Sequence, residues 1–217
     1  MSGTLAAPEV TSVWRPDWPL DPRRTLSRDR RGVGDPTLQY TESGIWRTTT
    51  TPEGPATVRL WGSGAELHVA AWGPGAAWAG AAVPGWLGAE DSPAGFPVGE
   101  HPLVDRLHRS TPWLRLGRTG RTWDVLVPAV LEQKVTGIEA HRTWRELVRL
   151  AGEPAPGPAP AGMRVVPSAE RVLAVTDGQG HACGLDGARR RALRAVASVA
   201  SRLEATDHQD CADLRRR

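Results

Sequence analysis

The sequence predicts an α+β protein in which a small antiparallel sheet with one covering helix comes first and a set of helices follows. Three observations lead to this prediction. Residues 45–72 are rich in β-branched residues and alternate in polarity between short turns, as antiparallel strands do. Residues 76–87 are apolar and long enough for one helix, and residues 122–152 and 184–204 repeat apolar residues at helical spacing. Strands followed by helices are typical of an α+β layer arrangement.

The 217 residues suffice for one or two modest domains. We expect an extended N-terminal segment over residues 1–40, because it is rich in Pro, Arg and Asp and has little core material. Trp14 and Trp18 are expected to pack on a neighbouring surface. A small sheet domain follows over residues 41–100, then a partial helical domain over 101–205 and a disordered polar tail over 206–217.

Within the sheet domain, residues 45–51, 57–61 and 66–72 are the predicted strands. The glycines at 62 and 64 mark a hairpin turn between the last two. Residues 76–87 are predicted to form the covering helix, interrupted by Pro84-Gly85.

In the helical part, residues 101–109 are predicted to form a helix whose Leu103, Val104 and Leu107 face inward. Residues 113–122 form a basic connection that includes Arg118 and Arg121.

A pair of helices is predicted over residues 122–152. Thr122 is the expected N-cap of the first, and Pro128 either kinks that helix or starts a new segment. The second runs from Ile138 to about Leu150, after a polar break that contains the chain's single lysine, Lys134.

The stretch from 153 to 163 is rich in Pro, Ala and Gly and reads as an exposed linker. Ser168 and Asp186 are expected to cap the two helices that follow. The last helix carries an apolar stripe formed by Leu193, Val196, Ala200 and Leu203.

Charge is distributed unevenly along the chain. The formal net charge is +3 and the isoelectric point is about 9.5, but residues 1–100 carry −3 and residues 101–217 carry +6. The second half is therefore the part expected to approach a polyanion.

No N-terminal basic and apolar run typical of a signal peptide is present, and no stretch has the length of a membrane span. Cys183 and Cys211 lack zinc or iron–sulfur spacing and are interpreted as reduced thiols of a cytoplasmic protein. The six histidines are scattered and form no ligand cluster, so we expect no metal site.

Two segments resemble a known family. Residues 130–136 read Val-Leu-Glu-Gln-Lys-Val-Thr, which resembles the aliphatic pair, polar residue, Gln, any residue, aliphatic and Ser or Thr pattern of the helix-hairpin-helix DNA glycosylase superfamily. The segment 184–204 resembles the next long helix of its 3-methyladenine DNA glycosylase II family, in the form found in actinobacteria. The resemblance covers residues from about 40 to 205.

This resemblance implies hydrolysis of the N-glycosidic bond of alkylated purines in duplex DNA, during base excision repair, without a metal or cofactor. It also implies that the break after residue 131 supplies the side chain that fills the gap left by an extruded base, at Gln133 and Lys134. With Thr136, Arg118 and Arg121, these are the candidate DNA-binding residues. The alternative interpretation is that residues 132–134 form a solvated helix end.

The family's phosphate-binding hairpin and catalytic aspartate are not found in residues 1–217, so no catalytic residue is assigned. The sequence reads as a glycosylase cut short before them, with little or no excision activity. The stripe on the last helix is then expected to be uncovered and to favour self-association.

Two other classes of function stay open at this point. The chain could be a non-catalytic DNA-binding module, or a protein-interaction module that uses exposed tryptophans. The ten tryptophans accompany one Phe and one Tyr, so we expect most of them to supply core bulk, with Trp113 as the exception.

Overall fold

The computed structural model describes residues 6–63 and 65–205. Cys211 and the predicted tail over 206–217 lie outside the described residues. The elements, in chain order, are β1 (Val10–Trp14), α1 (Pro22–Thr25), the 3-10 helix η1 (Leu26–Asp29), β2 (Leu38–Thr41), β3 (Gly44–Thr51), β4 (Gly54–Gly62), β5 (Leu67–Trp72), α2 (Ala76–Trp86), the 3-10 helix η2 (Pro93–Gly95), α3 (Pro102–Ser110), α4 (Thr122–Leu131), α5 (Gly137–Ala151), α6 (Ala169–Ala174), α7 (Asp177–Ala182), α8 (Gly187–Ser198) and α9 (Ala200–Ala205).

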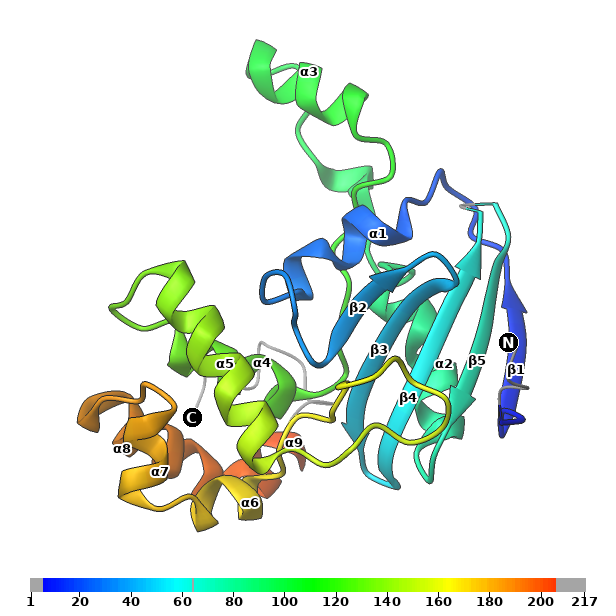
Figure 1. Cartoon of the computed structure of the whole chain (residues 1–217). Coiled ribbons are helices and arrows are strands. Elements are labelled where there is room, and N and C mark those ends of the chain that lie inside the picture. Colours follow the sequence, from blue (N-terminus) through cyan, green and yellow to red (C-terminus); the bar gives the residue numbers. More distant parts are fainter. Residues whose placement is uncertain (1–5, 64, 206–217) are drawn as a thin grey trace.

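The predicted α+β class is confirmed. The strands form one antiparallel sheet in the order β1-β5-β4-β3-β2, and the helices from α4 onward gather beside it (Figure 1). The tight turn between β2 and β3 needs a glycine, because Gly44 has φ 134° and a side chain there would collide with the carbonyl oxygen of Leu60.

All of one edge strand, β1, and most of the other, β2, lie in the segment 1–40, for which only extended chain was expected. β1 pairs with β5 from Val10↔Ala71 to Trp14↔Leu67, and β2 pairs with β3. Three β-branched residues, Val10, Thr11 and Val13, favour an edge strand, although the proline and arginine content around them masks the pattern. Trp14 and Trp18 pack against the core next to the sheet, as expected.

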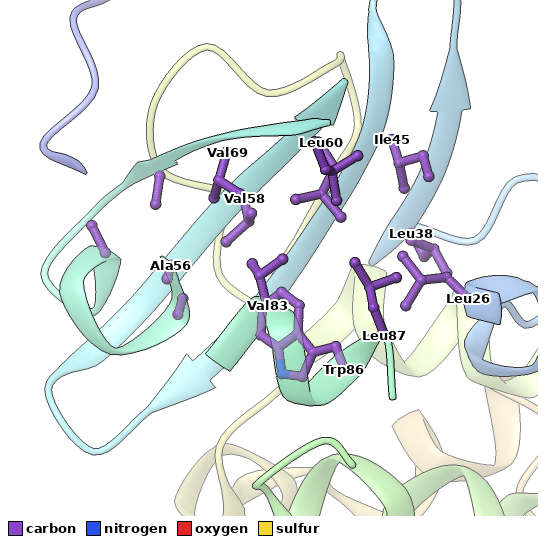
Figure 2. Close-up of a cluster of buried hydrophobic side chains, with 14 of the residues drawn as sticks. Leu26, Leu38, Ile45, Ala56, Val58, Leu60, Val69, Val83, Trp86 and Leu87 are labelled. Atoms are coloured by element: carbon purple, nitrogen blue, oxygen red, sulfur yellow. The ribbon is translucent and has the colours of Figure 1, made fainter. Parts of the chain in front are cut away.

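One core lies between the sheet and α2. Figure 2 shows aliphatic side chains of β3, β4 and β5 directed at Val83 and Trp86 of α2, and at Leu87 just beyond it. Pro84 lies inside α2, and the helix continues two residues past it, to Trp86. The covering helix is therefore where the sequence places it.

The other face of the sheet is covered by the segment predicted as an exposed linker. Ala155, Ala159 and Met163 pack against Trp46 and Trp72, and a bridge between Pro154 and Arg164 closes the loop (Figure 1). The prediction of an exposed linker was wrong because the second face of the sheet presents two large indoles that require cover.

A separate core joins α4, α5, α6 and α8. It includes Trp123, Leu131, Trp144, Leu147 and Leu193. Leu193 and Ala200 are buried and Val196 packs against this core, so the expectation of an uncovered stripe on the last helix was wrong. The stripe is covered because α8 packs on α4 and α6 within the chain itself.

The exposed apolar side chains lie on α3 instead. Leu103, Val104 and Leu107 were expected to face inward, yet no residue of α3 is buried and Leu107 is 53% exposed. Figure 1 shows α3 standing away from the rest of the fold. Helical periodicity identified the apolar side of this helix but not its environment.

Candidate nucleic-acid interface

The turn between α4 and α5, which the sequence singled out, is exposed. Glu132, Gln133 and Lys134 are exposed, and so is Ile138 in the first turn of α5. Lys134 has φ 55°, in the left-handed region that is uncommon for a residue other than glycine. The turn is therefore sharp and presents the Lys134 side chain to solvent.

The start of α5 is fixed by a reciprocal capping box. The Thr136 hydroxyl accepts a hydrogen bond from the Glu139 backbone amide at 3.3 Å, and Glu139 Oε2 accepts one from the Thr136 amide at 3.0 Å. Hydrogen bonds from the Thr136 amide and hydroxyl lower the pKa of Glu139 below its usual value. The Thr136 hydroxyl is thus already engaged in forming the turn.

The end of α4 is held from another helix. Arg189 of α8 is buried, and its Nη1 donates to the carbonyl oxygen of Leu131 at 2.9 Å while its Nη2 donates to that of Gly184 at 2.8 Å. Its Nε pairs with Asp186, the N-cap of α8, at 2.7 Å. Hydrogen bonds from the Arg189 backbone and side chain lower the pKa of Asp186 to about 2. Both sides of the turn are therefore anchored.

Arg118 and Arg121 lie away from this turn. Arg118 pairs with Glu90 at 2.9 Å, and Arg121 pairs with Glu204 at 3.3 Å with only 13% of its side chain exposed. Arg121 precedes α4 whereas Lys134 follows it, and the ten-residue helix between them spans about 15 Å. The structure gathers Gln133, Lys134 and Thr136 in one place but not these two arginines.

The cap of α4 differs from the prediction. Thr122 is the first helical residue, and the position before it, Arg121, makes no side-chain cap bond. Instead Glu204 Oε1 of α9 accepts a hydrogen bond from the Trp123 amide at 2.8 Å. This cap comes from 81 residues later, so local sequence could not reveal it. Pro128 lies within α4, which excludes the alternative of a new segment starting there.

One carboxyl group is enclosed between the sheet and α4. Asp124 as a residue keeps partial exposure, but its Oδ1 is buried without a hydrogen-bond partner in the described part of the chain. Its Oδ2 accepts from the Thr49 hydroxyl of β3 at 2.7 Å. Burial raises the pKa of Asp124 to about 6, against the opposing effects of Thr49, Arg47 and Arg121.

The cavity beside Asp124 is small. Its volume is about 40 Å³, and it is also lined by Arg31, Arg47 and Trp144. This space accommodates a few water molecules at most and is too small for a nucleobase. Asp124 therefore acts at the junction of the two layers rather than in a base pocket.

The structure adds residues to this region that the sequence did not identify. Arg31, in the loop before β2, pairs through Nε with Glu132 Oε1 at 3.2 Å. Arg142 and Arg145 of α5 follow Ile138 at helical spacing. The Arg-Arg-Gly-Val-Gly stretch at 30–34 was the available signal, but it lies in the segment for which only extended chain was expected.

The burial of the tryptophans shows which role they have. Nine of the ten tryptophans belong to or pack against the hydrophobic cores, which confirms their packing role, and Trp113, the expected exception, does not. All ten are at least partly buried, which removes the basis for an interaction module built on exposed tryptophans. Trp113 lies under the guanidinium of Arg24 at 5.5 Å.

Cys183 is a buried free thiol, and burial raises its pKa. Within residues 6–63 and 65–205, no helix has the length and apolarity to cross a membrane.

Comparisons with known proteins show which solved structures share this fold. No protein-family model matches the chain, and no curated protein sequence matches it. Among solved structures, a 3-methyladenine DNA glycosylase from Archaeoglobus fulgidus superimposes with a TM-score of 0.66 at 12% identity, covering 86% of this chain and 66% of its own.

Two further structures agree with this match. An 8-oxoguanine glycosylase/lyase from Clostridium acetobutylicum, in complex with double-stranded DNA containing cytosine opposite 8-oxoguanine, gives a TM-score of 0.62 at 10% identity over 93% of this chain. MBOgg1 in complex with a low-affinity DNA ligand gives 0.63 at 14% identity over 94%. The chain spans about two thirds of the length of these structures, namely 66% and 67%. At these identities the likeness establishes the DNA glycosylase fold.

Proposed function

We propose that this chain is a DNA-glycosylase-like protein of base excision repair that binds duplex DNA through the α4–α5 turn. The observation that carries the proposal is the geometry of this turn: Gln133 and Lys134 are exposed, and the turn is anchored at Leu131 by Arg189 and at Thr136 by the capping box. A rigid, exposed tip is what a protein needs to enter a DNA groove without a large entropic cost.

Within this proposal Lys134 neutralises a phosphate beside the groove, and Gln133 lies at the position that fills the gap in the base stack. An ammonium group on a left-handed residue projects outward from the turn, where a phosphate can reach it. Arg118 and Arg121 are proposed to add phosphate contacts, each only in part because Glu90 already pairs with Arg118 and Glu204 with Arg121.

The lesion class that we propose is alkylated purine, as the resemblance in residues 130–136 and 184–204 implies. The Archaeoglobus neighbour, which is a 3-methyladenine DNA glycosylase, supports this choice. The reaction requires no metal or cofactor, and the protein acts on DNA in the bacterial cytoplasm.

We further propose that the chain of 217 residues binds DNA but does not excise bases by itself. Excision needs a carboxylate close to the sugar of the extruded nucleotide, to stabilise the positive charge that develops there. Asp124 does not meet this need, because its carboxylate is enclosed against Thr49 and lies at the end of α4 remote from the turn. No other carboxylate is assigned to this role.

The experiment measures binding and excision on the same DNA. Fluorescence anisotropy is recorded with an intact duplex and with a duplex that contains a tetrahydrofuran abasic-site analogue, and release of 3-methyladenine is measured from methylated DNA. We expect salt-dependent binding, tighter to the abasic duplex, and no release. Release of 3-methyladenine contradicts the lack of excision, and the absence of binding to either duplex contradicts the proposal as a whole.

One observation favours a second function, association with another protein or another copy of the chain. Val104 and Leu107 of α3, together with Phe96, Leu114 and Leu116, line a groove of about 530 Å³. Sedimentation velocity across a concentration series tests self-association: a concentration-dependent dimer supports it, and a monomer at all concentrations contradicts it.

A further inference from the structure

A second loop lies against the α4–α5 turn. The loop from Arg31 to Asp35 lies between η1 and β2 in the sequence. In space it packs along the first two turns of α5. Arg31 pairs with Glu132 at the end of α4. Gly32 packs so closely on the His141 ring that an added Cβ would lie 2.9 Å from Nδ1. The loop and the α4–α5 turn, although a hundred residues apart in sequence, therefore form one surface.

Hydrogen bonds to one buried carboxylate hold the conformation of this loop, as other hydrogen bonds hold the α4–α5 turn. Asp35 is fully buried, and its carboxylate accepts hydrogen bonds from the Arg31 amide at 2.6 Å, from the Thr37 amide and hydroxyl at 2.8 Å each, and from Trp144 Nε1 at 3.0 Å. This single side chain ties both ends of the loop to α5. A loop held in this way presents its tip in a fixed direction.

Val33 occupies that tip. It is flanked by Gly32 and Gly34, whose φ values of 79° and 82° favour glycine and fold the chain sharply on either side. Val33 is 86% exposed and Ile138 is 84% exposed, the two highest values among the large apolar side chains that the structure describes. Both lie beside the start of α5, because Ile138 is one helical turn before His141, on which Gly32 packs.

The surroundings of these two aliphatic side chains are basic. We define the paired-loop surface as residues 31–34 and 132–138 together with His141, Arg142 and Arg145. It carries four cationic residues, Arg31, Lys134, Arg142 and Arg145, whereas Glu132, its one acidic residue, is paired with Arg31. Cationic residues around exposed aliphatic tips match a nucleic-acid groove, in which phosphates line the rims and unstacked base steps accept apolar wedges.

We propose that Val33 is a second wedge side chain, inserted from the minor groove into the base stack next to the gap that the α4–α5 turn occupies. This inference rests on the proposed function and assigns it a further residue on a loop that precedes the sheet. Gln133, which is proposed to fill the gap, has a polar side chain, and a rigidly held valine on the adjacent loop supplies the missing apolar contact. Gly32 and Gly34 allow the close approach of the loop backbone to the DNA.

The test uses the full chain with Val33→Ala and Val33→Asp, and Val98→Ala as a matched control. Val98 is also an exposed valine, at 55%, but it lies in the segment before α3. Binding is measured by anisotropy with the intact and abasic duplexes. In a second measurement, 2-aminopurine placed beside the abasic site reports unstacking by its fluorescence.

We expect Val33→Ala to weaken binding to the abasic duplex by about tenfold, the loss that follows from removing two buried methyl groups. Binding to the intact duplex should change by no more than about twofold, since an inserted side chain acts only where the stack opens. The 2-aminopurine signal should fall with Val33→Ala, and fall further with Val33→Asp. Val98→Ala should behave like the unmodified protein.

The outcomes separate this inference from the proposed function. If the unmodified chain binds neither duplex, the proposed function fails and the inference fails with it. If the chain binds and Lys134→Ala weakens binding while both Val33 variants bind normally, the proposed function stands and the wedge role of Val33 is overturned. Equal weakening on both duplexes, with an unchanged 2-aminopurine signal, also overturns it, because Val33 then touches DNA without entering the stack.

Discussion

Trp144 Nε1 donates a hydrogen bond of 3.0 Å to Oδ1 of Asp35, across 109 residues of sequence. The bond joins α5 of the helical layer to the loop that leads into the sheet. Both groups are buried, so neither has water as an alternative partner. The contact therefore fixes the position of the sheet layer against the helical layer and holds the Val33 loop in place.

Replacing Asp35 by Ala should lower the free energy of unfolding by about 3 kcal/mol, because several buried donors then lose their acceptor. Chemical denaturation monitored by tryptophan fluorescence measures this change. Asp17→Ala is the control, since Asp17 is exposed, and it should shift stability by no more than about 0.5 kcal/mol. Equal effects of the two substitutions would show that the loop is not anchored through Asp35.

The pH dependence of stability should report on Asp124. Its pKa is about 6 in the folded chain and about 3.9 when unfolded, so the folded state holds the extra proton between these values. The stability that this group contributes is therefore lost as the pH rises through 6. Asp124→Asn, which cannot ionise, should gain about 1 kcal/mol relative to the unmodified chain between pH 5 and pH 8.

The measurement is urea denaturation of both proteins at pH 5, 6, 7 and 8. Only the difference between the two proteins is informative, because other carboxyl groups titrate in both. A difference that stays constant across this range would contradict the raised pKa of Asp124.

Leu147 and Leu107 lie on helices that were predicted from the same periodicity, but replacing each by alanine should change stability by different amounts. Leu147 of α5 is fully buried, and Leu147→Ala should cost about 3 kcal/mol of stability. Leu107 of α3 is half exposed, and Leu107→Ala should cost less than about 1 kcal/mol. Thermal unfolding by calorimetry distinguishes them. A large cost at Leu107 would mean that α3 is covered in solution, by the chain itself or by another copy.

Arg189 should be needed for the geometry of the α4–α5 turn. Arg189→Met keeps most of the side-chain volume but leaves the Leu131 and Gly184 carbonyl oxygens without their donor, so stability should fall by about 2 kcal/mol. Arg191→Met, on an exposed position of the same helix, should be close to neutral. Loss of DNA affinity at a temperature at which Arg189→Met is still folded would confirm a positioning role, and unchanged affinity would exclude it.

The fold was predictable where local pattern and environment agree. Alternating residues in β3, β4 and β5 and helical periodicity in α4, α5 and α8 gave the α+β class, because each of these elements buries the face that its pattern marks. Two elements departed from this rule. α3 has an apolar side that the described chain leaves exposed, and the Pro- and Ala-rich loop after α5 covers Trp46 and Trp72 although its composition is typical of a linker.

The candidate site was predictable only in part. Gln133, Lys134 and Thr136 lie together because they are neighbours in sequence, and the helix break was visible in the residue pattern. Arg31, Gly32 and Asp35, and with them Val33 on the same loop, could not be connected to these residues. The contacts of Arg31, Gly32 and Asp35 with Glu132, His141 and Trp144 span a hundred residues. The cap that Glu204 supplies to α4 was hidden for the same reason.

The measurement that tests the central claim most directly is the salt dependence of DNA binding with and without Lys134. Affinity for one abasic duplex is measured by anisotropy over a range of salt concentrations, for the unmodified chain, for Lys134→Gln and for Arg149→Gln, an exposed cation near the other end of α5. If Lys134 contacts a phosphate, Lys134→Gln reduces the slope of log affinity against log salt by about 0.9, and Arg149→Gln leaves it unchanged. An unchanged slope with Lys134→Gln, in a chain that still binds, would contradict DNA binding through the α4–α5 turn.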